Sequence, residues 1–293
     1  MLGFSLARIP FLNISGDASS SFKNKTLPGE WYNYTPGRYL IGISLHLVTI
    51  IPAGFLMIFQ FVPIIRYKAI LFHRVNGYII ILLVLLGNAG AAMIAPRAFG
   101  GTITSQAAVW ILIAITTTSM VLAYVNIKKL QIEQHRAWML RAMFYLGTII
   151  TVRLIMIISA QIMSISPGFY GIKSCGQIAF MHSESLEATS LRYSVCATGD
   201  ATTKVAVPAK FGGEIENIAA ALTESAGMAL WLALVLHLVG VEIYLALTPK
   251  ENERLRNVSY VRQMEAGYKN PGRAGLTADR LGDAEIWIPK VIE

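Results

Sequence analysis

Two pairs of ionisable residues occur inside long apolar stretches of this sequence, where charge is costly. One stretch carries His135 and Arg153, and a later one carries Glu224 and Glu242. The members of each pair are 18 positions apart (153 minus 135, and 242 minus 224). This spacing is about five turns of a helix, so each pair shares one helix face. A poorly solvated carboxylic acid keeps its proton to higher pH and can act as a general acid, which makes Glu224 a candidate proton donor.

The two stretches are expected to be neighbouring helices that cross a bilayer in opposite directions. Arg153 and Glu224 then lie toward one membrane surface, and His135 and Glu242 lie toward the other. Opposite charges that face each other inside a bilayer are less costly than lone charges. We therefore expect the two helices to contact each other or to line one cavity, with Arg153 beside Glu224 and His135 beside Glu242.

The candidate site at the outer end combines Glu224, Arg153 and His46, with Arg97 at its rim. A cation beside Glu224 favours the carboxylate and makes it a poorer acid, in which case His46 or Glu242 is the better donor. The residues that we consider as catalytic are Glu224, Arg153, His46, Glu242 and His135.

Three other interpretations remain open at this stage. In the first, the paired charges only hold helices together, while Arg136, Arg141 and Glu242 extend to the lipid headgroups. In the second, the protein is an electron carrier whose haem is bound by histidines of neighbouring helices, since haem needs ligands that face each other. Nothing in the spacing selects such ligands among His46, His73, His135 and His237. In the third, the protein is a non-catalytic scaffold or resembles a transporter.

The composition predicts an all-α integral membrane protein. Of the 293 residues, 54% are hydrophobic and 14% are charged, whereas ordinary soluble domains have roughly a quarter charged residues. The net charge of +8 comes from lysines and arginines in short segments beside apolar runs. This pattern is typical of loops on the cytoplasmic side of a membrane. We therefore expect a lipid bilayer, and no nucleic acid, as a partner, while the oligomeric state stays open.

Five apolar runs are long enough to span a bilayer, and they predict a bundle of five transmembrane helices. The basic loops put the N-terminus outside and the C-terminus in the cytoplasm. Small residues in the second run predict close packing against another helix. We expect an outer segment over residues 1–38, a membrane domain over 39–247 with a long outer loop at 164–218, and a cytoplasmic tail over 248–293; the spans are 39–62, 76–95, 107–125, 137–163 and 219–247.

Sequons and cysteines fall in the segments that are expected outside. Asn13, Asn24 and Asn33 each begin an Asn-x-Ser/Thr sequon, which predicts N-glycosylation in a lumenal segment. Cys175 and Cys196 share the long outer loop, and an oxidising compartment favours a disulfide between them. These features predict a multi-pass membrane protein of the endoplasmic reticulum.

Two motifs resemble a large family of uncharacterised membrane proteins. The family pattern has a His-Arg-x-x-Gly-Arg segment at the start of one span and a His-Arg-x-Trp-Met-x-Arg segment at the start of another. Here HRVNGY begins at His73, with Tyr78 in place of the usual arginine, and QHRAWMLRAMFYLGTIITVRL begins at Gln134 and ends just after Arg153. The resemblance covers about residues 39–247.

A fungal branch of that family resembles the membrane-bound terpene cyclase of the ascofuranone pathway. The resemblance implies a cyclase that protonates an epoxidised prenyl chain on a phenol and closes a ring, in fungal secondary metabolism. The implied partner is an apolar, prenylated small molecule that partitions into the bilayer. The chemistry needs a proton donor and exclusion of water. It requires no metal or redox cofactor, and we predict none.

Overall fold

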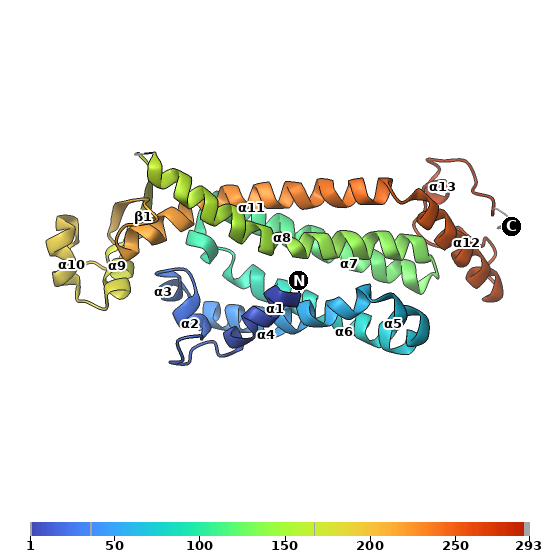
Figure 1. Ribbon diagram of the computed structural model, residues 1–293, viewed down its shortest axis with the longest axis horizontal. Helices are drawn as coiled ribbons and strands as arrows, with labels where there is room; N and C mark the ends of the chain where they lie inside the picture. The colour runs from blue at the N-terminus through green and yellow to red at the C-terminus, as the bar shows by residue number, and fades with distance from the viewer. Residues whose placement is uncertain (1, 36, 167, 290–293) are drawn as a thin grey trace. The chain divides into compact units, whose positions relative to one another are not determined.

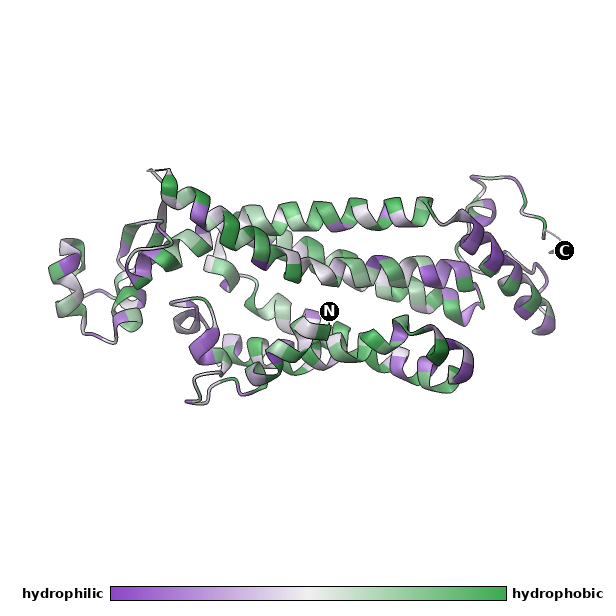
Figure 2. Ribbon diagram, viewed as in Figure 1, coloured by the Kyte–Doolittle hydropathy of each residue, from purple (hydrophilic) through white to green (hydrophobic). Residues whose placement is uncertain are grey.

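A computed structural model describes residues 2–35, 37–166 and 168–289 of the protein. Within these residues, five helices are long and apolar enough to cross a membrane. Figure 1 shows them as the long coiled ribbons, and in Figure 2 hydrophobic residues predominate along their lengths. This confirms the predicted class, an all-α integral membrane protein. The five are α4 (Gly37–Met57) with its 3-10 continuation η2 (Ile58–Phe61), α6 (Ile70–Ile94), α7 (Ile103–Lys128), α8 (Ile132–Ile165) and α11 (Ile215–Ala246).

All five helices begin before the apolar runs that predicted them, and two of these extensions have a clear physical cause. α8 starts at Ile132 instead of residue 137, and α11 starts at Ile215 instead of residue 219. Each extension includes a buried glutamate that has a partner. Glu133 accepts a hydrogen bond from the hydroxyl of Ser259, and Glu216 accepts one from the ring of His182. A polar group that has a hydrogen-bond partner can be buried at a helix end. Hydropathy alone therefore underestimated the lengths of these two helices.

Shorter elements join the long helices. The N-terminal segment contains α1 (Leu2–Arg8), η1 (Ile9–Leu12), α2 (Phe22–Lys25) and α3 (Glu30–Tyr34). Its aromatic side chains Phe11, Phe22, Trp31 and Tyr34 form a hydrophobic core with residues of α4. The connections contain α5 (Pro63–Lys68) and η3 (Ala98–Gly101), and the tail contains α12 (Pro249–Glu265) and α13 (Ala278–Leu281).

The long connection between α8 and α11 is folded. It contains β1 (Tyr170–Ser174), α9 (Cys175–His182), α10 (Leu186–Arg192), η4 (Ser194–Thr198) and β2 (Lys204–Pro208). The strands pair antiparallel, with Gly171 opposite Val207 and Lys173 opposite Val205. A disulfide joins Cys175 to Cys196. The loop is therefore a cross-linked subdomain that fixes the position of β1.

The chain divides into two compact units. The first unit combines the residues up to Ile113 with Ile149–Ala233, and the second combines Ala114–Thr148 with the residues from Leu234 onward. α7, α8 and α11 contribute to both units. The core of the first unit includes Val152 and Met156 of α8, alanines of α11 and the inward-facing valines of β2.

Glycines allow α4 and α6 to pack closely within the first unit. A Cβ atom added to Gly90 would lie 2.6 Å from the backbone nitrogen of His46 and 2.7 Å from the carbonyl oxygen of Gly42. A Cβ added to Gly87 would lie 3.0 Å from the hydroxyl of Thr49. The prediction that the small residues of the second span contact another helix is confirmed.

Replacing Gly90 with Val is expected to destabilise the protein, because the added side chain meets backbone atoms that cannot move away. Overpacking of this kind costs about 1–3 kcal/mol. The measurement is the thermal unfolding midpoint of the full chain in detergent micelles. Gly240→Val in α11 is the matched control, since a Cβ there has no neighbour within 4 Å. Equal midpoints for the two variants would contradict the packing argument.

Candidate functional site

The candidate site is built around the turn between α6 and α7. Phe99 adopts a left-handed backbone conformation, with φ of 53°, and Gly100 and Gly101 follow with φ of 82° and 64°. The amide of Phe99 donates a hydrogen bond to the Glu30 carboxylate at 2.8 Å. A Cβ atom on Gly100 would lie 2.8 Å from the Cβ of Thr223. The turn is thus held between α3 and α11, and its unusual backbone is typical of functional sites.

Glu30 is a buried carboxylate at the start of α3, with 6% of its surface exposed. Its Oε1 accepts hydrogen bonds from the Tyr34 hydroxyl and the Phe99 amide, both at 2.8 Å. Burial, and then the neighbouring Glu30, raise the pKa of Tyr34 well above its usual value. Tyr34 therefore remains a neutral hydrogen-bond donor that stabilises the Glu30 carboxylate.

Lys173 of β1 is the buried cation of this site, with 3% of its surface exposed. Its Nζ donates a hydrogen bond to the Thr223 hydroxyl at 2.8 Å, and that hydroxyl donates in turn to the carbonyl of Ala219. Burial lowers the pKa of Lys173 to about 8, although the charges of Glu224 and Glu30 oppose the change. An amine that exchanges its proton this close to neutral pH is suited to general acid–base chemistry.

A glycine lets β1 approach α11 closely enough to position Lys173. Gly171 lies two residues before Lys173, on the same face of the strand. A Cβ atom there would lie 2.9 Å from the Cβ of Ala220. The side chain of Lys173 therefore reaches Thr223 one turn further along α11.

The expected ion pair between Arg153 and Glu224 is absent, and that prediction was wrong. No ion pair within 4.0 Å joins the two side chains, both of which the structure describes. The guanidinium of Arg153 instead lies 5.7 Å from the centre of the Phe99 ring. Glu224 is an exposed residue of α11 whose nearby cation is Lys173. The α6–α7 turn and the α8–α11 loop thus supply the partners that the sequence assigned to facing helices.

Arg153 lies close to a second arginine from the N-terminal segment. Burial, and then the charge of Arg153, lower the pKa of Arg8. The guanidinium of Arg8 lies over the rings of Phe11 and Phe4, at 4.8 and 5.2 Å from their centres. The Nε of Arg153 is buried and has no hydrogen-bond acceptor among the described residues. Two adjacent cations with an unused donor form a place that suits a ligand oxygen carrying negative charge.

His46 and Arg97 take part in other contacts. Nδ1 of His46 donates a hydrogen bond to the carbonyl of Gly87 at 2.9 Å, which links α4 to α6. Arg97 lies over the ring of Tyr39, 4.5 Å from its centre. No contact with Glu224 is found for either side chain within the described residues, so the expected cluster of Glu224, Arg153 and His46 does not form as predicted.

The pair expected at the other end of the two helices is also different, and lies in the second unit. Glu242 accepts hydrogen bonds from Nε and Nη2 of Arg141 at 2.6 and 2.9 Å. Nδ1 of His135 donates to the carbonyl of Ala123 at 3.0 Å. Pairing of Glu242 with His135 was therefore the wrong prediction, because a guanidinium binds a carboxylate through two parallel hydrogen bonds and is the stronger partner.

The prediction that the fourth and fifth spans contact each other is confirmed within each unit separately. In the first unit, the Ser225 hydroxyl of α11 donates to the carbonyl of Met156 of α8 at 3.2 Å. In the second unit, Arg141 of α8 pairs with Glu242 of α11.

The sequence is also similar to known proteins. A family model described as "Predicted membrane protein (DUF2306)" matches residues 43–176. The matched segment contains Phe99, Arg153 and Lys173, and it ends before Glu224. A protein of Aspergillus versicolor named "Ava biosynthesis cluster protein G" is 27% identical over 283 residues, which covers 78% of this chain and 81% of that relative. No solved structure matches the chain.

These similarities agree with the fold. The chain is similar to predicted membrane proteins, and to a protein whose name assigns it to a biosynthesis cluster.

Proposed function

We propose that this protein is a membrane-bound terpene or meroterpenoid cyclase that opens the epoxide of a prenylated phenol and closes a ring. One observation carries the proposal: a buried lysine whose pKa is about 8 lies beside two carboxylates, next to apolar helices. Such a group can deliver a proton in a site from which water is excluded. The name of the Aspergillus versicolor relative supports a role in a biosynthetic pathway.

The ammonium of Lys173 is the proton donor in this mechanism. Glu224 was the first candidate from the sequence, but it is exposed and serves here as the base, whereas the neighbouring Lys173 is buried and supplies the proton. The alternative donors are engaged elsewhere, because His46 donates to Gly87 and Glu242 pairs with Arg141. An ammonium that loses its proton near pH 8 is the acid that this arrangement supports best.

The reaction balances as an isomerisation. The Lys173 ammonium transfers a proton to the epoxide oxygen, the carbon–oxygen bond at the more substituted carbon breaks, and a hydroxyl and a tertiary carbocation form. An internal hydroxyl or alkene of the substrate attacks this cation with its electron pair and closes the ring. The Glu224 carboxylate stabilises the positive charge and accepts the proton that the product loses. Proton transfer from Glu224 to the Lys173 amine then restores the starting state.

Arg8 and Arg153 hold the aromatic end of the substrate. A phenol oxygen can accept hydrogen bonds from these guanidinium groups, including the unused Nε of Arg153. Phe99 lies against Arg153 and presents an aromatic face close by. Aromatic faces stabilise cations, so they suit a reaction that passes through a carbocation.

The site belongs on the lumenal side in this proposal, in a membrane of the endoplasmic reticulum. The sequons at Asn13, Asn24 and Asn33 and the disulfide Cys175–Cys196 support that sidedness. Modification of the three asparagines, the N-terminus outside and the C-terminus in the cytoplasm remain predictions.

Replacing Glu224 with Gln tests the proposal. Turnover of an epoxidised prenyl phenol by microsomes that carry the variant should fall about 100-fold, because general acid–base groups contribute roughly 10²–10⁴-fold. Product is measured by chromatography with mass detection, since a cyclised isomer has the mass of its substrate. Glu187→Gln, at an exposed position of α10, is the control.

Two results would argue against the assignment. Undiminished turnover by Glu224→Gln would remove this residue from the mechanism. Failure of the wild-type microsomes to form any isomer from a panel of such epoxides would exclude the cyclase function.

A further inference from the structure

A groove lined by basic residues lies in the second unit. Its volume is about 550 Å³, within the range of roughly 300–1,000 Å³ that is usual for small-molecule sites. Four of its seven lining residues are lysine or arginine, and none is acidic. We call it the cationic groove; its lining residues are Lys129, Tyr268, Lys269, Asn270, Arg273, Ala274 and Arg280.

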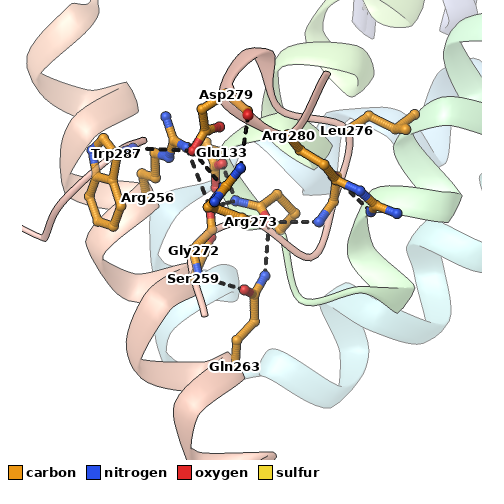
Figure 3. Close-up of polar contacts among 12 residues, drawn as sticks. Glu133, Arg256, Ser259, Gln263, Gly272, Arg273, Leu276, Asp279, Arg280 and Trp287 are labelled. Carbon is orange, nitrogen blue, oxygen red and sulfur yellow. Dashed lines mark hydrogen bonds and ion pairs between the residues drawn. The ribbon is translucent and has the colours of Figure 1, made fainter. Parts of the chain in front are cut away.

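Buried amides build the groove by fixing the tail against the corner between α7 and α8. Oε1 of Gln131 accepts hydrogen bonds from Nε2 of Gln263 and from the amide of Gly275, at 2.9 and 2.8 Å. Nε2 of Gln131 donates to the carbonyl of Gly272 at 3.0 Å. Gln263 also accepts from the amide of Gly272, as Figure 3 shows. Gln131 and Gln263 are fully buried, so this part of the tail is a folded element of the unit.

One buried carboxylate pairs with two arginines, of which Arg273 lines the groove. Figure 3 shows Arg256 and Arg273 converging on Asp279, and their ion pairs measure 2.6 and 3.1 Å. Burial alone would raise the pKa of Asp279, but hydrogen bonds from Thr277, Trp287 and Arg256, and the charge of Arg256, lower it to about 2. Asp279 is therefore ionised, yet its single charge cannot neutralise both arginines.

The other cations of the groove, Lys129, Lys269 and Arg280, take part in no ion pair within the described residues. Nη1 of Arg280 donates to the carbonyls of Ala274 and Gly275, which orients the guanidinium but leaves its charge unbalanced. The groove thus presents an excess of positive charge, and hydrogen bonds orient the guanidinium groups of Arg273 and Arg280.

The groove lies next to the ends of two membrane-spanning helices. Lys129 directly follows the last residue of α7, and α8 begins three residues later at Ile132. At ~1.5 Å per helical residue, such positions lie at the level of the lipid headgroups. Anionic headgroups are attracted to basic residues at this depth.

We propose that the cationic groove binds a phosphate monoester, supplied by the headgroup of an anionic membrane lipid. A phosphate offers several acceptor oxygens, which match the ammonium groups of Lys129 and Lys269 and the planar guanidinium groups of Arg273 and Arg280. This inference concerns the second unit alone and does not depend on the proposed cyclase function.

The test uses the purified full-length chain and a fluorescent short-chain phosphatidic acid as the probe. Its affinity is compared with that of the matching phosphatidylcholine, which lacks a monoester. Wild type should bind phosphatidic acid saturably and at least about tenfold more tightly, since the monoester accepts charge-assisted hydrogen bonds from the groove. Lys129→Gln combined with Lys269→Gln should weaken that binding by about ten- to a hundredfold.

The control carries the same loss of charge at two lysines that do not line the groove. Lys68→Gln combined with Lys250→Gln removes two exposed lysines and should leave the affinity within about twofold. Equal affinities for the two lipids, or equal weakening by the two double variants, would overturn the proposal. Unfolding midpoints of both variants are compared with wild type, so that a folding defect is distinguished from loss of the site.

Competition by soluble phosphates distinguishes a lipid headgroup from a free phosphate as the ligand. Glycerol phosphate and inorganic phosphate compete with the fluorescent lipid in the same assay. Weak competition, at millimolar concentration, supports a lipid headgroup as the ligand. Competition as strong as that of unlabelled phosphatidic acid would overturn the lipid source in favour of a soluble phosphate ester.

Discussion

Replacing Lys173 with Met is expected to lower turnover of the epoxide substrate by about 10³-fold, because it removes the acid that opens the ring. Lys173→Arg should be nearly as inactive, since a guanidinium keeps the charge but does not release a proton at neutral pH. The arginine variant therefore separates proton donation from simple attraction. Lys204→Met, at an exposed position of the paired strand β2, is the control.

The pH dependence provides an independent readout of the same assignment. The ammonium form of Lys173 is needed, and it is lost as the pH rises through about 8. Wild-type turnover should therefore decline above that pH. A profile that stays flat to pH 10, or full activity of Lys173→Arg, would show that another group supplies the proton.

Replacing Asp279 with Asn is expected to open the folded tail. Loss of this carboxylate leaves Arg256 and Arg273 without a counter-charge. Breaking a fully buried pair costs about 3–5 kcal/mol, and the partial exposure of the arginines reduces this to roughly 2–3 kcal/mol. Hydrogen exchange of the amides in α12 measures the local opening directly. Asp283→Asn, at an exposed position nearby, is the matched control.

Acid should have the same effect as this substitution. The pKa of Asp279 is about 2 in the folded protein, against an ordinary value of 3.8. Its contribution to stability is therefore complete above about pH 4 and is lost as the pH falls toward 2. The protection factors of the α12 amides should therefore fall over this range in the wild type, whereas those of Asp279→Asn should show little further change. Unchanged protection of α12 in the variant would mean that the buried amides alone hold the tail.

Hydropathy predicted the membrane fold because the bilayer imposes a simple requirement on sequence. A run of apolar residues that spans the hydrocarbon core must be helical, so the number and order of the five spans could be derived. Close packing at Gly87 and Gly90 could be predicted for a similar reason, since small residues are informative wherever two backbones approach. Helix ends such as Glu133 were missed because their burial depends on distant partners.

The candidate site was predicted only in part, because depth along a helix does not determine contacts. Arg153 and Glu224 were paired because both were expected at the same depth in the membrane. In the structure, Phe99 lies next to Arg153 and Lys173 lies next to Glu224 instead. Lys173 comes from a loop that looked irregular in sequence. A signal in sequence was lacking for Lys173, because the apolar residues Tyr170 and Ile172 are the exposed ones of β1 while Gly171 and Lys173 are buried. Glu30 carried no signal either, since its role depends on the strained turn at Phe99.

The cross-link between Cys175 and Cys196 has a practical consequence for whoever expresses this protein. It encloses the segment that begins two residues after Lys173, and so it anchors the strand that carries the proposed acid. In a bacterial cytoplasm the thiols stay reduced, and the strand would be held only by its pairing with β2 and its contacts with α11. A yeast or filamentous fungal host, whose secretory pathway oxidises thiols, is therefore the appropriate source of material, and an inactive bacterial preparation would say little about the enzyme.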